Sequence, residues 1–275
     1  MAFDFDKAER ESLAAVKPNI AAIVLGQSSG GKSYFAGTLP GKTLFLYTQG
    51  EEHGRDAALL GAGKESKVVP IAVDLDQGKV LSADAAYKRL LSTLDVESIK
   101  KAGFNSVVLD GLTELEQLVR ATSEWATHCR TKNGDHNAFA EPTATTKMIR
   151  PVLDALRTLQ RELNVNYVVT CLLMVKGMAE DGEITVSEPK LVGYEVAALL
   201  IPQFPDQILI GRMTNPEGVT KPRLQFNTVP TKAVKEKSGE IKKMIGFTPR
   251  LRGVSELPAN MAADFKAVLK LKGVK

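Results

Sequence analysis

The sequence has few cysteines and few aromatic residues, and it lacks a long apolar run. Of its 275 residues, two are cysteines (Cys129 and Cys171), one is a tryptophan, and 6% are aromatic. Both cysteines lie in apolar-periodic segments, so we expect buried, reduced thiols and no disulfide framework. No apolar run approaches the roughly 20 residues that span a bilayer, and the acidic N-terminus lacks the apolar core of a secretion signal. These absences predict a cytoplasmic protein with no membrane partner.

Internal repeats, low-complexity tracts and an obvious linker are also absent from the sequence. The shares of hydrophobic residues (44%) and charged residues (25%) are ordinary for a globular protein. At 275 residues, the chain could be one large domain or one domain with a small appendage.

Positive charge is concentrated late in the chain. Residues 207–275 hold 14 Lys and Arg against 5 Asp and Glu, whereas residues 1–206 hold 22 against 27. A basic segment on an acidic body is typical of proteins that bind a polyanion. A solvated lysine-rich surface is the alternative explanation.

Short apolar runs closed by glycine or polar residues predict buried strands. These runs cover residues 20–25, 43–47, 68–73, 106–110 and 167–173, and Pro70 confines the third to an edge or a bulge. Helical patterns cover residues 83–101, 113–129, 143–163 and 261–271, and the third either kinks or starts at Pro151. Shorter strands are expected at residues 184–186, 207–211 and 223–227. The pattern predicts an α/β fold with a mostly parallel sheet, helices on both faces, and later strands added by antiparallel pairing.

Residues 26–33 read Gly-Gln-Ser-Ser-Gly-Gly-Lys-Ser, between a predicted strand and a predicted helix. This is the spacing of a P-loop, in which backbone N–H groups cradle phosphates and the lysine reaches the β- and γ-phosphates. The Ser33 hydroxyl is a suitable ligand for Mg²⁺. The pattern predicts a site for a nucleoside triphosphate (ATP or GTP) with Mg²⁺, and a plain glycine turn is the alternative. The expected ligand-binding residues are Gly26, Gln27, Ser28, Ser29, Gly30, Gly31, Lys32, Ser33 and Tyr34.

A P-loop also needs an acidic residue at the end of a neighbouring strand to hold the magnesium. Asp110 ends the predicted strand over residues 106–110 and is followed by Gly111. Ser33 and Asp110 therefore form the expected metal site. The alternative role for Asp110 is a cap for the helix that begins near Thr113.

Hydrolysis needs a group that orients or deprotonates the attacking water. Glu51 and Glu52 follow the second predicted strand, whose carboxyl end lies on the same side of a parallel sheet as the P-loop. The pattern does not decide between the two, and solvated carboxylates on a turn are the alternative. Thr170 lies in a later strand, where it either senses the γ-phosphate or bonds locally.

Together these residues resemble the RecA-like core ATPases of bacteriophages, over roughly residues 18–250. The resemblance implies an ATPase core over this range, an N-terminal extension over residues 1–17 and a basic C-terminal helical tail over residues 251–275. The most specific segments are residues 26–33, the Glu51-Glu52 turn and residues 107–111, with a late stretch at 181–182, 189–193 and 205–208. The resemblance implies an ATPase that acts on single-stranded DNA in phage recombination or strand annealing. It also implies a homo-oligomer with nucleotide at subunit interfaces, and a phage single-strand-binding protein as a further partner.

Two features depart from the family pattern. The family places a basic Lys-x-Arg motif from one subunit against the γ-phosphate of the next, and here Lys235-Glu236-Lys237 occupies the similar place. Lysine lacks the planar fork of arginine, and a surface charge cluster is the alternative. The hairpin that contacts DNA in the family corresponds to residues 176–190, which hold several carboxylates that would repel phosphates.

DNA contact is therefore expected from the basic C-terminal segment. Its basic residues are Lys221, Arg223, Lys232, Lys242, Lys243, Arg250 and Arg252. Two other functions stay open from the sequence: a nucleotide-gated assembly protein that does not act on DNA, and a helicase-like motor. A zinc site at His128, Cys129 and His136 is not expected, because these residues lack a closed ligand spacing.

Overall fold

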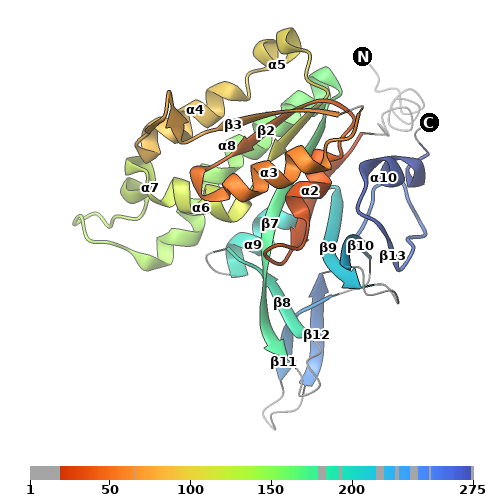
Figure 1. Ribbon diagram of the computed structural model, residues 1–275. Coiled ribbons are helices and arrows are strands. Elements are labelled where there is room, and N and C mark those ends of the chain that lie inside the picture. Colours follow the sequence, from red (N-terminus) through yellow and green to blue (C-terminus); the bar gives the residue numbers. More distant parts are fainter. Residues whose placement is uncertain are drawn as a thin grey trace, which may run out of the picture.

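The computed structural model describes residues 19–64, 66–178, 184–191, 194–214, 220–226, 229–235, 241–247 and 249–273 (Figure 1). Its main sheet has nine strands, eight of them in the order β13-β10-β9-β1-β7-β6-β2-β3, while β8 pairs with β7 alone. The strands are β1 (Ala21–Gly26), β2 (Gly41–Tyr47), β3 (Ser66–Ala72), β6 (Ser106–Leu109), β7 (Asn166–Met178), β8 (Ile184–Pro189), β9 (Asp206–Thr214), β10 (Thr220–Gln225) and β13 (Asn260–Ala262). The α/β class and the edge position of the strand that contains Pro70 are confirmed.

Six strands of this sheet run parallel. β1 pairs with β7 and β9, β2 pairs with β3 and β6, and β6 pairs with β7, all in parallel. Antiparallel pairing joins β10 to β9, β13 to β10, and β8 to β7. The expectation of antiparallel pairing is therefore right for β8 and β10 but wrong for β9. The chain returns over helix α9 (Tyr194–Leu200) before β9, and this crossover aligns β9 with β1.

Helices cover both faces of the sheet. They are α2 (Lys32–Gly37), α3 (Glu52–Gly61), α4 (Ala83–Thr93), α5 (Val96–Ala102), α6 (Leu112–Arg120), α7 (Ser123–His128), α8 (Glu141–Leu163), α9 and α10 (Phe265–Leu271). Ala21, Ile23 and Leu25 of β1 enter one apolar cluster, whereas Ala22 and Val24 enter another on the opposite face. Each cluster also contains helical side chains, so both faces are buried, as the continuous apolar strands predict. No helix in the described part of the chain has the length and apolarity to cross a bilayer.

Two predicted helices are each divided by a capping residue. The expected helix over 83–101 breaks after Thr93, and the Asp95 carboxylate accepts a hydrogen bond from the Ser98 N–H at the start of α5. The expected helix over 113–129 breaks at Thr122, whose hydroxyl accepts from the Trp125 N–H. The prediction of two continuous helices is wrong, because these side chains satisfy backbone donors that a continuous helix would use.

Pro151 lies inside α8, ten residues after the helix begins at Glu141. The option that this helix starts at Pro151 is therefore wrong. The predicted burial of three other residues is confirmed, since Cys129 and Cys171 are buried and Trp125 is 8% exposed.

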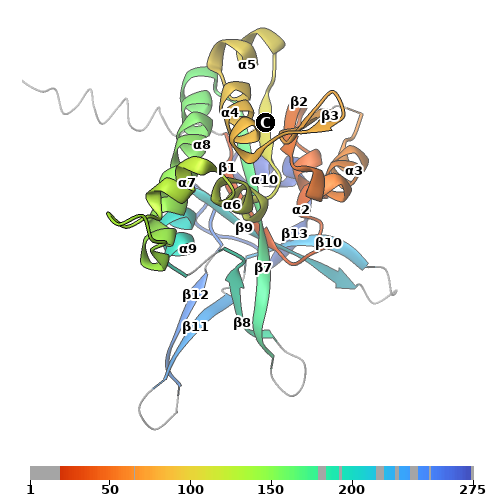
Figure 2. The same cartoon turned by 90° about the vertical axis from the view of Figure 1, so that its left-hand side faces the viewer.

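Two hairpins extend away from the body on the same side of the molecule (Figures 1 and 2). One is formed by β7 and β8. The other is a separate sheet of β11 (Val229–Lys235) and β12 (Ile241–Phe247), which the sequence did not predict as strands. The remaining short elements are β4 (Leu75–Asp76), β5 (Lys79–Val80) and the 3₁₀ helices η1 (Gln49–Glu51), η2 (Ala138–Ala140) and η3 (Ile201–Gln203).

The segment predicted as a C-terminal tail packs into the main fold. β13 forms the outer edge of the sheet beside β10. The Phe265 ring of α10 stacks on Phe35 of α2, with 4.2 Å between the ring centroids, and both side chains are fully buried. The helix expected over residues 261–271 begins at Phe265, because the preceding residues form β13.

A buried ion pair joins the C-terminal segment to β9, near the centre of the sheet. The Asp206 carboxylate accepts hydrogen bonds from the N–H groups of Ala21 (2.9 Å) and Arg252 (2.7 Å). The Lys272 ammonium lies 2.9 Å from the same carboxylate, and the two side chains are 3% and 0% exposed. Removal of one partner would leave an uncompensated charge in the interior, which is strongly destabilising.

Replacement of Lys272 with methionine is therefore expected to lower the free energy of unfolding by about 3–5 kcal/mol. Chemical denaturation measures this change. The matched control is Lys270→Met on the same helix, where the side chain is exposed and the expected change is within about 0.5 kcal/mol. Equal stability of the two variants would contradict a stabilising role for the pair.

Candidate nucleotide-binding site

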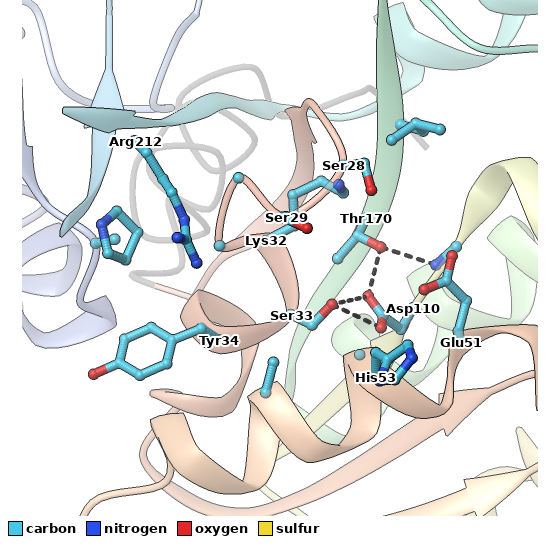
Figure 3. Close-up of a pocket in the computed structure, with 18 of the residues that line it drawn as sticks. Ser28, Ser29, Lys32, Ser33, Tyr34, Glu51, His53, Asp110, Thr170 and Arg212 are labelled. Atoms are coloured by element: carbon cyan, nitrogen blue, oxygen red, sulfur yellow. Dashed lines mark hydrogen bonds between the residues drawn. The ribbon is translucent and has the colours of Figure 1, made fainter. Parts of the chain in front are cut away.

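A cavity of about 950 Å³ lies at the carboxyl end of β1, between α2 and the strands β9 and β10 (Figure 3). The loop between β1 and α2 forms its floor. Gly31 has φ +99°, a conformation that favours glycine, and a Cβ atom there would collide with Pro222 of β10. The Gly30 N–H donates to the Gln27 carbonyl (3.1 Å), and the Phe35 N–H donates to the Gly31 carbonyl (2.9 Å) as α2 begins. The loop is thus a tight turn whose residues 28–31 line the cavity.

Lys32 crosses this loop. Its ammonium donates to the Gln27 carbonyl at 2.9 Å. Burial lowers the pKa of Lys32, while the nearby Asp110 and Glu51 carboxylates act in the opposite direction. A bound polyanion would likewise favour the charged ammonium.

Asp110 lies at the centre of a hydrogen-bond network. The Ser33 hydroxyl donates to its two oxygens (3.0 and 2.8 Å), and the Thr170 hydroxyl donates to one of them (2.7 Å). The Gly111 N–H donates in turn to Thr170 Oγ1 (2.8 Å). β7 lies between β1 and β6, and this order places Thr170 between the loop and Asp110. Burial raises the pKa of Asp110, and the two hydroxyl hydrogen bonds partly offset that effect.

The alternatives for these two residues do not match the geometry. The cap position of α6 is Gly111, with φ +103°, and no side chain caps this helix. Asp110 is therefore directed to Ser33 and Thr170 and does not cap a helix. Thr170 bonds a residue 60 positions away, so its contact is not local.

The oxygen atoms of Ser33 and Asp110 are hard ligands of the kind that Mg²⁺ prefers. Among the described residues there is no group of three or more His, Cys, Asp or Glu side chains that could hold a metal. Magnesium usually takes one or two protein ligands and completes its shell with water and substrate phosphates. The residues present therefore fit a magnesium ion that arrives with a phosphate ligand, and they do not fit a self-sufficient metal cage.

The structure separates Glu51 from Glu52. Glu51 ends η1, lines the cavity and is half-buried, whereas Glu52 is exposed and does not line the cavity. Burial raises the pKa of Glu51 to about 7, and the negative charges of Asp110 and Glu114 add to this effect against that of Lys32. A carboxyl group with a pKa near neutrality is suited to proton transfer. Of the two candidates, Glu51 is the one in the site.

Several residues that line the cavity were missed from the sequence. They include His53, Gly54 and Leu60 of α3, Arg212 of β9, Pro222 of β10, and residues 262–264. Lys221, which the sequence assigned to a DNA-binding face, also lines this cavity. Arg212 follows a predicted strand, and parallel pairing of that strand with β1 would have placed it beside the glycine-rich loop.

The other basic residues of the C-terminal quarter have different environments. Arg223 bonds the Asn260 side chain, Arg250 bonds the Pro202 and Phe204 carbonyls, and Arg252 bonds the Asn19 carbonyl. Lys235 ends β11, and Lys237 lies outside the described residues, as do residues 179–183 of the acidic hairpin. His136 bonds Glu141 at 2.8 Å and His128 lies 3.5 Å from Glu124, so these histidines pair with carboxylates.

No protein-family model matches the chain, and no curated protein matches it. The resemblance to RecA-like core ATPases therefore stays a prediction. The function has to be inferred from the chemistry of the cavity itself.

Proposed function

We propose that the protein binds ATP together with Mg²⁺ and hydrolyses it. The observation that carries this proposal is the hydrogen-bond network of Ser33, Asp110 and Thr170 beside Lys32. A hydroxyl, a buried carboxylate and a lysine meet at one glycine-rich turn, and Glu51 lies on the same side of the cavity (Figure 3). This combination suits phosphoryl transfer, where catalysis rests on positioning and charge stabilisation.

Each residue has a defined part in this proposal. The N–H groups of residues 28–33 and the Lys32 ammonium bind the phosphates. Ser33 and Asp110 would hold the magnesium ion, which neutralises charge on the phosphate oxygens when bound. Glu51 orients the attacking water and accepts its proton. Thr170 fixes the Asp110 carboxylate through its 2.7 Å hydrogen bond.

We further propose that single-stranded DNA is a partner, and that the protein assembles as a homo-oligomer. The supporting observations are the basic balance of residues 207–275 and the family resemblance. Phosphate contacts dominate DNA affinity and require accessible basic groups. Lys232, Lys242 and Lys243 lie on the protruding β11–β12 hairpin, which makes that hairpin the proposed contact.

A nucleotide-gated assembly that does not act on DNA is the second candidate. It is favoured by the engagement of Arg223 and Arg250 in hydrogen bonds within the protein, and by the position of Lys221 in the cavity. Arg223 and Arg250, like Arg252, are thus bonded within the protein, and Lys221 lines the cavity, which leaves fewer basic residues for the expected DNA-binding face.

The test is ATP hydrolysis by the wild type, with and without Mg²⁺ and with and without single-stranded DNA at low salt. Magnesium-dependent hydrolysis that DNA stimulates would support ATP hydrolysis as the function and single-stranded DNA as a partner. Hydrolysis that is indifferent to DNA, combined with ATP-dependent oligomerisation, would favour the second candidate. Absence of ATP binding would overturn the proposed function.

Gly54 offers a test of the metal site that leaves its ligands unchanged. This residue lies in the first turn of α3, where a Cβ atom would collide with the Asp110 carboxylate and lie 3.1 Å from Ser33 Oγ. Gly54→Ala is expected to weaken ATP binding in Mg²⁺ by roughly tenfold, or about 1.4 kcal/mol. Binding in EDTA should change less.

Calorimetric titration of ATP in Mg²⁺ and in EDTA measures both effects. The control is Gly63→Ala, where nothing lies within 4 Å of the added Cβ atom. Alanine favours helices over glycine by about 1 kcal/mol, so the Gly54 variant should keep its helix. Unchanged magnesium dependence would contradict the assignment of Ser33 and Asp110 to the metal site.

A further inference from the structure

The cavity has two chemically different ends. Asp110, Glu51 and Thr170 lie at one end, where the phosphates and magnesium are proposed to bind. Tyr34 and Arg212 lie at the other end, with Lys32 and Ser33 between the two groups (Figure 3). A volume of about 950 Å³ is at the upper end of the range for small-molecule sites. The cavity therefore has room for more than a triphosphate.

The second end exposes apolar surface that the protein does not cover. Tyr34 is 39% exposed and Leu60 is 80% exposed, and both line this cavity. The backbones that carry them pack closely, because a Cβ atom on Gly61, the residue after Leu60, would collide with the Tyr34 carbonyl. An aromatic ring and a leucine side chain are thus presented to the cavity by two tightly packed helices.

Arg212 faces this apolar surface from the opposite strand. Its guanidinium extends from β9 toward Tyr34 (Figure 3). Within the described ranges, no residue forms a hydrogen bond or an ion pair with it, and the residue is exposed. Its planar guanidinium is suited to stacking on an aromatic ring as well as to binding an anion.

We propose that this end of the cavity is the nucleobase subsite, in which the base stacks on the Tyr34 ring beside Leu60 and the Arg212 guanidinium stacks on its other face. This inference rests on the proposed function and specifies how the nucleoside is held. Tyr34 directly follows Ser33, and its side chain points away from Asp110 and from the proposed phosphate site (Figure 3). A ligand whose γ-phosphate lies near Glu51 extends its base toward Tyr34.

Stacking has a measurable signature, because it affects the nucleoside and not the phosphates. Substitution of a stacking aromatic residue by alanine costs about 5- to 150-fold in affinity. Tyr34→Ala is expected to weaken binding of ATP by roughly tenfold, while binding of inorganic tripolyphosphate stays within about twofold. Tyr34→Phe keeps the ring and should bind both ligands like the wild type.

Calorimetric titration of magnesium ATP and of magnesium tripolyphosphate tests the proposal on wild type and variants. Leu60→Ala should weaken ATP binding by about threefold, and its control is the neighbouring Leu59→Ala, which is exposed and outside the cavity. Tyr34→Ala that binds ATP like the wild type, or that weakens both ligands equally, would overturn the subsite while leaving the proposed function intact. A wild type that binds neither ligand would overturn both.

Arg212 has its own pair of variants. Arg212→Lys keeps the positive charge but removes the planar guanidinium group. If Arg212 stacks on the base, this variant should bind ATP more weakly and bind tripolyphosphate nearly as well as the wild type. If Arg212 instead binds phosphates, Arg212→Ala would weaken both ligands equally and Arg212→Lys would restore both. That second result would overturn the stacking role of Arg212.

Discussion

Replacement of Lys32 with alanine is expected to lower ATP hydrolysis by at least about 100-fold, the loss seen when one preorganised donor to developing charge is removed. The Lys32 ammonium lies across the glycine-rich loop and donates a hydrogen bond to the Gln27 carbonyl at 2.9 Å. In this position it faces the space where the β- and γ-phosphates are proposed to lie. Steady-state phosphate release measures the effect.

The matched control is Lys88→Ala, since Lys88 is an exposed lysine on α4. This variant should hydrolyse ATP like the wild type. Far-ultraviolet circular dichroism should be the same for both variants, because neither side chain belongs to an apolar cluster. If Lys32→Ala retained wild-type activity, phosphoryl transfer at this loop would be excluded.

Replacement of Glu51 with glutamine is expected to lower hydrolysis by about 10²- to 10⁴-fold, while ATP binding persists. Glutamine keeps the shape of the side chain but cannot accept the proton of the attacking water. The control is Glu52→Gln, the neighbouring exposed residue that does not line the cavity. Loss of activity in the Glu52 variant and not in the Glu51 variant would reverse the assignment.

The pKa of Glu51 gives this prediction a pH dependence. Because burial raises the pKa to about 7, the free protein carries a protonated Glu51 below that pH. Proton acceptance requires the ionised form, so kcat/KM should rise through pH 7 and level off above it. The residual activity of Glu51→Gln should lack this inflection.

The raised pKa of Glu51 also makes the free energy of unfolding depend on pH: as the pH rises, activity should increase while this contribution to stability is lost. The folded pKa lies above the ordinary value of 4.5, so the folded protein binds the proton more tightly than the unfolded chain does. Ionised Glu51 therefore disfavours folding once the pH rises above 4.5, and this effect is complete above pH 7. Glu51→Gln should have a higher free energy of unfolding than the wild type at pH 8, measured by urea denaturation. A less active but more stable variant is what a catalytic carboxylate predicts.

Local sequence was sufficient for the elements that depend on local patterns. The strand before the glycine-rich loop and the strand that ends before Asp110 lie where their apolar runs predicted, and Pro70 lies on an edge strand. The helix breaks at Asp95 and Thr122 were missed although both residues are common helix caps, because apolar periodicity continues across each break.

Long-range pairing was the part that the sequence did not supply. No local sequence pattern predicts that β9 pairs in parallel with β1, yet this pairing brings Arg212 into the cavity. Lys221 is in the same situation, since its position depends on β10 folding back beside β9. The glycine-rich loop, Asp110 and the Glu51-Glu52 turn were accessible from sequence because each follows directly from one strand, although the sequence did not decide between the two glutamates.

The position of α10 and β13 decides where this chain can be shortened. A polypeptide ended at residue 250, the boundary that the family resemblance suggested, would lose the Phe265 ring that covers Phe35 and the ammonium that neutralises Asp206. It would also turn β10 into a bare sheet edge, whose unpaired N–H and C=O groups can pair with another molecule. We therefore expect a polypeptide ended at residue 250 to associate with itself through β-pairing and to form insoluble aggregate.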